Sequence, residues 1–127
     1  MPKKILIIDD DPDLVEAVTM ILESKKYDVA AAYGGLEGLE KVKTEKPDLV
    51  VLDVMMPDKD GYTVCKELKA DPKLCKIPVL LLTAVVSNIP STHYTQQMGL
   101  ETEADDYMDK PVEPADLVNR IEVLLSK

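Results

Sequence analysis

The sequence predicts an α/β fold in which helices cover both faces of a five-stranded parallel sheet. Short apolar runs alternate five times with helical segments, which is typical of a three-layer sandwich. The runs are almost continuously apolar, as expected for strands that are buried on both faces of a sheet. Several runs end in a carboxylate, a hydroxyl or an ammonium, and ligands of parallel sheets bind beyond the carboxyl ends of the strands.

The first half of the chain predicts two strand–helix units. The first strand is expected at residues 5–8, and Asp11 and Pro12 then supply the N-cap and the first residue of a helix. The apolar face of that helix is formed by Leu14, Val15, Val18, Ile21 and Leu22. A second strand is expected at residues 27–32. After the break at Gly34 and Gly35, a second helix is marked by Leu36, Leu39 and Val42.

The second half continues the alternation. Strands are predicted at residues 48–52, 79–82 and 104–108, and a third helix at residues 62–69. Glu113 and Pro114 open the last helix, whose apolar face consists of Leu117, Val118, Ile121, Leu124 and Leu125. The fourth helix is predicted to be irregular, because Pro90 and poor helix formers occupy residues 84–103. We expect a short helix at residues 91–98, and five helices in all.

Length and composition indicate one domain over residues 1–127. The net charge of −9 argues against direct nucleic acid binding, since phosphate contacts need clustered Lys and Arg. No apolar run approaches the roughly 20 residues of a membrane helix, and the apolar run near the N-terminus is too short for a signal peptide. A cytoplasmic protein is therefore expected. Cys65 and Cys75 have no metal-site spacing, which favours free thiols in a reducing compartment.

Five polar residues near the strand ends form the candidate site. Asp9 and Asp10 follow the first run, Asp53 the third, Thr83 the fourth, and Lys110 the fifth. Each residue alone has an ordinary explanation, such as a turn carboxylate, a β-branched strand end or a solvated lysine. Asp11 is more simply a helix cap and is left out of the site. Because the runs are expected to be neighbouring parallel strands, these five side chains are predicted to share one pocket.

The residue types predict the chemistry of that pocket. Three adjacent carboxylates repel one another, so they must bind a cation or take up protons. Oxygen ligands favour a hard cation such as Mg²⁺. Asp53 is a candidate nucleophile, since aspartyl carboxylates accept phosphoryl groups. Lys110 would balance the phosphoryl charge, and the Thr83 hydroxyl would donate to a phosphoryl oxygen.

The chain resembles the receiver domain of two-component response regulators (CheY-like) over nearly its whole length. The resemblance is carried by residues 5–12, 52–57, 82–84 and 104–111 and by the pair Asp60-Gly61. It implies a flavodoxin-like sheet with strand order 2-1-3-4-5. It also implies a phosphorylation-dependent signalling switch, with phosphoryl transfer to Asp53 from a histidine kinase or a histidine phosphotransfer protein.

The same resemblance assigns roles to individual residues. Asp9, Asp10, Asp53 and the backbone carbonyl of Met55 would hold Mg²⁺, and Lys110 would contact the phosphoryl group. Thr83 and Tyr107 would form the switch pair, which biases the face of the fourth helix, the fifth strand and the fifth helix toward partner binding. The protein would be no enzyme beyond assisting its own phosphorylation and slow self-dephosphorylation. It would be a monomer or a phosphorylation-dependent dimer.

Two alternatives and one departure accompany this interpretation. A receiver-fold scaffold that binds partners without phosphorylation is the main alternative. A haloacid-dehalogenase-type phosphatase is disfavoured, because it needs Asp-x-Asp at the nucleophile, and Met55 stands two residues after Asp53. The departure is the stretch between Thr83 and residue 104, which is a few residues longer than usual for the family. The chain is expected to be either a stand-alone receiver or a part of a longer regulator or hybrid kinase.

Overall fold

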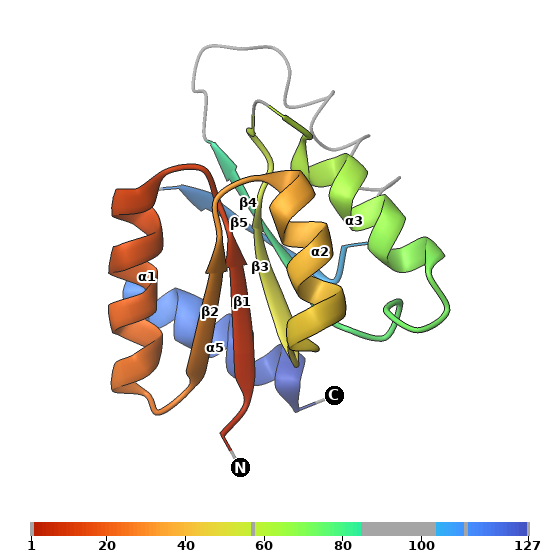
Figure 1. The fold of residues 1–127 in the computed structure, drawn as a ribbon. Helices are drawn as coiled ribbons and strands as arrows, with labels where there is room; N and C mark the ends of the chain where they lie inside the picture. The colour runs from red at the N-terminus through yellow and green to blue at the C-terminus, as the bar shows by residue number, and fades with distance from the viewer. Residues whose placement is uncertain (1, 57, 85–103, 111, 127) are drawn as a thin grey trace.

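Five parallel strands form one sheet in the order β2-β1-β3-β4-β5 (Figure 1). The strands are β1 (Lys4–Ile8), β2 (Asp28–Ala32), β3 (Leu49–Asp53), β4 (Val79–Ala84) and β5 (Asp106–Lys110). The structure is a computed structural model that describes residues 2–56, 58–84, 104–110 and 112–126. It confirms the predicted fold class and strand order.

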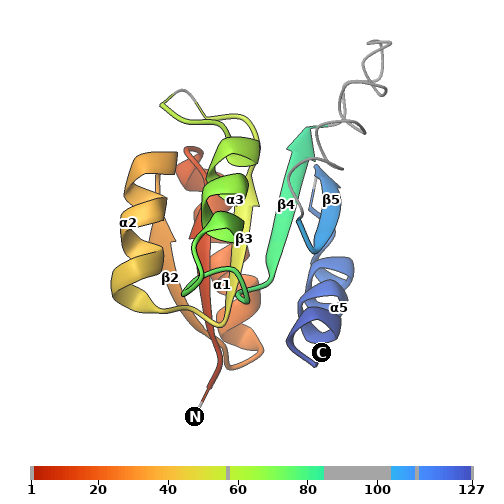
Figure 2. The ribbon, with the colours of Figure 1, turned by 90° about the vertical axis from the view of Figure 1, so that its right-hand side faces the viewer.

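Helices cover both faces of the sheet, as Figure 2 shows. The described helices are α1 (Pro12–Ser24), α2 (Gly35–Glu45), α3 (Gly61–Ala70) and α5 (Pro114–Leu125). The helices α2 and α3 pack on one face, and α1 and α5 pack on the other. The short helix predicted at residues 91–98 lies outside the described residues.

Two hydrophobic cores result from the alternation of side chains along the buried strands. One core joins Leu6, Val50 and Leu81 to side chains of α2 and α3. The other joins Ile7, Leu80 and Leu82, among other strand residues, to α1 and α5. All apolar residues of β1 from Ile5 to Ile8 are fully buried, which explains why the strand reads as a continuous apolar run.

Acidic side chains cap the N-termini of most of the described helices. Asp11 caps α1, as predicted, by accepting from the backbone N–H of Asp13 at 3.0 Å. Glu113 caps α5 in the same way. The N-cap of α2 is Gly34, which has no side chain to offer. Asp58, in the loop after β3, replaces it by accepting from Gly35 N at 3.0 Å and Leu36 N at 3.1 Å.

Several strand boundaries differ from the prediction. The fifth strand begins two residues later than expected, at Asp106. The reason lies in tertiary contacts, because Asp105 forms hydrogen bonds with residues of other elements just before the strand begins. Its backbone N–H donates to Val79 O at 3.0 Å, and its carboxylate accepts from Val79 N and Lys69 Nζ, both at 2.8 Å. Thr83 lies inside β4 rather than after it, because it pairs with Asp109 of β5.

The remaining sequence-based expectations concern thiols and membranes. Cys65 is buried, Cys75 is half-buried, and neither forms a disulfide bond, as predicted. Among the described helices, none is both long enough and apolar enough to cross a lipid bilayer.

Candidate functional site

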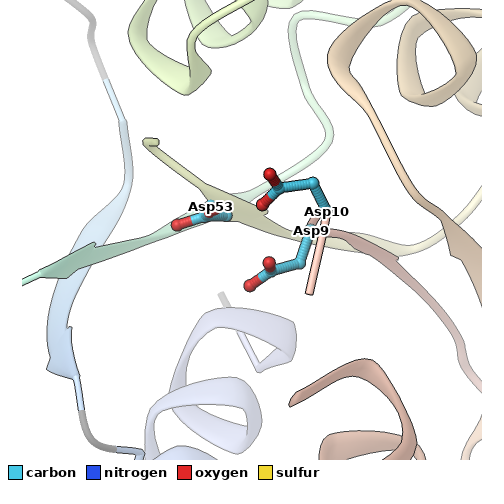
Figure 3. Close-up of side chains that lie close together, drawn as sticks. All are labelled: Asp9, Asp10 and Asp53. Carbon is cyan, nitrogen blue, oxygen red and sulfur yellow. The ribbon is translucent and has the colours of Figure 1, made fainter. Parts of the chain in front are cut away.

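Three carboxylates gather at the carboxyl end of the sheet (Figure 3). Asp9 follows β1 directly, and Asp53 is the last residue of β3, the strand that pairs with β1. One oxygen from each of Asp9, Asp10 and Asp53 lies within 4.8 Å of the others. Asp9 and Asp53 are buried, whereas Asp10 is exposed and leaves the cluster open to solvent. The predicted acidic cluster is therefore present, and the parallel pairing of β1 and β3 produces it.

Lys110 reaches this cluster from β5. Its Nζ lies 2.9 Å from Asp53 Oδ1 and donates to Asp9 Oδ2 at 3.2 Å. The contact with Asp53 is an ion pair. Among the described residues, Asp53 Oδ1 has no hydrogen-bond partner although it is buried. A buried carboxylate oxygen that accepts no hydrogen bond is unusual, and here the ammonium of Lys110 is its charged neighbour.

The electrostatics of the site reflect a shortage of positive charge. Burial raises the pKa of Asp9, and the nearby Asp53 charge adds to the rise. The Asp11 N–H, at 2.9 Å from Asp9 Oδ1, and Lys110 oppose that rise only in part. For Lys110, burial lowers the pKa, but the carboxylates of Asp53 and Asp9 outweigh burial, so the pKa is raised overall. One ammonium thus faces three carboxylates.

These residues fit a divalent hard cation. All side-chain donors of the cluster are carboxylate oxygens, which suit Mg²⁺ and not softer metals. Asp53 Oδ1 accepts no hydrogen bond among the described residues, and one ammonium faces three carboxylates, so the excess negative charge favours a cation at this place. Met55 lies two residues after Asp53, in the loop that follows β3, and its side chain is exposed. Its backbone carbonyl as a further ligand stays a prediction.

Gly61 keeps the loop after β3 close to the site. Its N–H donates to Val54 O at 2.9 Å, and Val54 N donates to Leu82 O at 3.1 Å. A Cβ at position 61 would lie 2.2 Å from the backbone oxygen of Asp53. Only glycine permits this approach of α3 to the strand end. This explains why glycine follows the N-cap residue Asp60.

The predicted switch residues lie on the neighbouring strands β4 and β5. Thr83 is buried, and its hydroxyl donates to Asp109 Oδ1 at 2.9 Å. Tyr107 is 37% exposed, opposite Leu81 in the sheet. The sequence reasoning missed Asp109. The pairing of Thr83 with Asp109 could have identified this residue, but the pairing is known only once the register of β4 and β5 is known.

Curated relatives cover the whole of this chain. The alkaline phosphatase synthesis transcriptional regulatory protein PhoP of Bacillus subtilis is 42% identical over 127 residues, and this chain covers 50% of its length. The DNA-binding dual master transcriptional regulator RpaA of Synechocystis is 39% identical, again with 50% of its length covered. The chain thus spans about half the length of the curated relatives it matches.

These names conflict with the prediction that the protein binds no nucleic acid directly. That prediction was drawn from the net charge of −9, which describes these 127 residues only. The charge says nothing about the half of each relative's sequence that lies outside the match, so it cannot exclude nucleic acid binding. The prediction is therefore withdrawn.

Solved structures share the fold. The receiver domain of a signal transduction histidine kinase from Syntrophus aciditrophicus is 35% identical, with a TM-score of 0.88 over 98% of this chain and 90% of that one. The BeF3-activated N-terminal receiver domain of Klebsiella pneumoniae RstA is 34% identical, with a TM-score of 0.84 over 98% and 99% of the two chains. The family model described as "Response regulator receiver domain" matches residues 5–122. The chain belongs to the response regulator receiver domain family.

Proposed function

We propose that this receiver domain is a signalling switch that accepts a phosphoryl group on Asp53 from a histidine kinase or a histidine phosphotransfer protein, with Mg²⁺ as cofactor. One observation carries the proposal. The buried Asp53 Oδ1 lacks a hydrogen bond among the described residues and lies 2.9 Å from Lys110 Nζ, beside two further carboxylates. A carboxylate in this setting is poised to act as a nucleophile toward an anionic group that Lys110 attracts.

The transfer uses residues that the geometry brings together. An Asp53 oxygen attacks the phosphorus of a phosphohistidine, the P–N bond breaks, and the imidazole leaves and takes up a proton. Lys110 shifts from pairing with Asp53 to holding the phosphoryl oxygens. Asp9, Asp10 and Asp53, together with the backbone carbonyl of Met55, would hold Mg²⁺, and the bound cation would supply positive charge to the phosphoryl oxygens. The chain modifies itself and turns over no other substrate.

The proposed readout is the face that includes β5 and α5. The Thr83 hydroxyl would move to the phosphoryl group and the Tyr107 ring would turn inward, so that phosphorylation shifts the population of two states. The relative RstA has a BeF3-activated receiver, which supports a phosphoryl-responsive state in this family. The partner and the change between monomer and dimer stay predictions, as does a cytoplasmic location.

Binding of beryllofluoride, a phosphoryl mimic, tests this function. With Mg²⁺, ¹⁹F NMR should show protein-bound fluoride for the wild type, and no such signal for Asp53→Ala or after addition of a chelator. Lys110→Gln should weaken binding, because the cation that faces the mimic is lost. If the folded wild type binds no beryllofluoride, the phosphorylation-independent scaffold becomes the better interpretation.

A further inference from the structure

The Thr83 hydroxyl is engaged away from the acidic cluster. It donates to Asp109 Oδ1 at 2.9 Å, across two neighbouring parallel strands. Thr83 is directly opposite Asp109 in the register, so both side chains project from the same face of the sheet. Side chains alternate along β4, so Thr83 projects from the same face of the sheet as Leu81. Leu82 projects from the other face, and it accordingly belongs to the other core.

One proton limits what this hydroxyl can do. A threonine hydroxyl has a single O–H donor, so it cannot donate to Asp109 and to a phosphoryl oxygen at the same time. The acceptor is a carboxylate, and hydrogen bonds to ionised acceptors are stronger than neutral ones. Thr83 is buried, which restricts exchange of this bond with water, whereas Asp109 is exposed. The two acceptors therefore compete for one donor.

Asp109 is otherwise uncommitted in the described part of the chain. No cation pairs with it there, and the neighbouring Lys110 is turned to Asp53 and Asp9. Lys110 projects from the opposite side of β5, as alternation along a strand requires. Among the described residues, Thr83 is thus the side chain whose position the Asp109 carboxylate fixes by a hydrogen bond.

We propose that Asp109 is a positioning residue that holds Thr83 in the resting state and thereby lowers the affinity of the site for a phosphoryl group. The inference rests on the proposed function, since it requires Thr83 to donate to that group. The apparent affinity of a ligand falls in proportion to the fraction of the protein in the competent state. Asp109 reduces that fraction by holding the donor elsewhere.

A double-mutant cycle with beryllofluoride and Mg²⁺ tests this role. Asp109→Ala should lower the apparent dissociation constant about tenfold or more, the effect of one net hydrogen bond to a charged acceptor. In a Thr83→Val background, which has no hydroxyl, the same substitution should change affinity little. In a Thr83→Ser background, which restores the hydroxyl, the gain should return. Thermal unfolding of each variant confirms that the binding is measured on folded protein.

A second comparison separates the hydrogen bond from the charge of Asp109. Removing a negative charge near an anion site would also raise affinity, and it would do so equally in all three Thr83 backgrounds. Asp109→Asn keeps an acceptor oxygen and removes the charge, so it should give a smaller gain than Asp109→Ala. Equal gains for the two substitutions, or an undiminished gain with Thr83→Val, would overturn the proposal.

The wild-type result distinguishes this proposal from the function on which it rests. Wild-type binding with no change in Asp109→Ala would reject the role of Asp109 and leave the phosphoryl switch intact. Absence of wild-type binding would reject both.

Discussion

Asp9 shows at the scale of one residue why the site calls for a cation. Burial and the Asp53 charge raise its pKa, and one ammonium and one backbone N–H offset them only in part. The chain folds with these carboxylates together although they repel one another. Shifted pKa values of this kind are typical of functional sites, where they accompany binding or catalysis.

Magnesium should therefore stabilise the folded protein. A ligand that binds only the native state adds about 2.7 kcal/mol when its concentration is a hundred times the dissociation constant. We expect Mg²⁺ to raise the midpoint of thermal unfolding, and Asp9→Asn to reduce that rise. Asp13→Asn is the matched control, because Asp13 is an exposed carboxylate of α1 outside the cluster. A rise of the same size in Asp9→Asn and wild type would contradict the cation site.

Met55 bears on the lifetime of the phosphorylated state. Its exposed thioether side chain, two residues after Asp53, is poorly suited to orient a water molecule for hydrolysis. Val85, two residues after Thr83, is apolar too, and it lies outside the described residues. We predict that the phosphorylated form lasts for minutes or longer with Mg²⁺, and that Met55→Asn shortens its lifetime. Time-resolved intact mass measures both, and wild-type hydrolysis within seconds would refute the prediction.

At the scale of elements, Gly61 sets the distance between α3 and the end of β3. A Cβ there would meet backbone atoms of Asp53 and Val54, which cannot move aside as a flexible side chain could. Overpacking of this kind costs about 1–3 kcal/mol. Gly61→Ala should lower the free energy of unfolding by that amount in denaturant titrations, and weaken Mg²⁺ binding. Lys66→Ala, on the exposed side of α3, should stay within about 0.5 kcal/mol of wild type.

Asp58 links the loop after β3 to α2 and gives that link a pH dependence. Hydrogen bonds from Leu36 N and Gly35 N lower its pKa. The carboxylate therefore contributes stability above its unfolded pKa of about 3.9, and this contribution is lost as the pH falls through the lower folded value. Asp58→Ala should have a lower unfolding midpoint than wild type at pH 7, and the difference should shrink below about pH 4. A constant difference across this range would contradict the assignment.

The sequence predicted elements better than it predicted side-chain partners. Continuous apolar runs located β1 and β3, and the strand-end rule then brought Asp9 and Asp53 together. The start of β5 was placed wrongly, because only Met108 in that edge strand is buried. The Thr83–Asp109 bond and the Asp58 cap join segments far apart in the chain. Such contacts depend on register and loop path, which local sequence does not encode.

At the scale of the whole molecule, the two cores on either side of the sheet support the site. Leu117 of α5 is fully buried, whereas Leu36 of α2 is 59% exposed. Leu117→Ala should lower the free energy of unfolding by about 2–5 kcal/mol. Leu36→Ala should change it by no more than about 0.5 kcal/mol. Denaturant titration of both variants provides the comparison, and equal losses would contradict this assignment of the core.

The central claim concerns Asp53, and intact mass spectrometry tests it most directly. The protein would be incubated with acetyl phosphate and Mg²⁺, beside Asp53→Ala and a sample with chelator. The account predicts a gain of one phosphoryl group in the wild type only. The same gain in Asp53→Ala, or no gain in a wild type that also fails to accept a phosphoryl group from histidine donors, would contradict it.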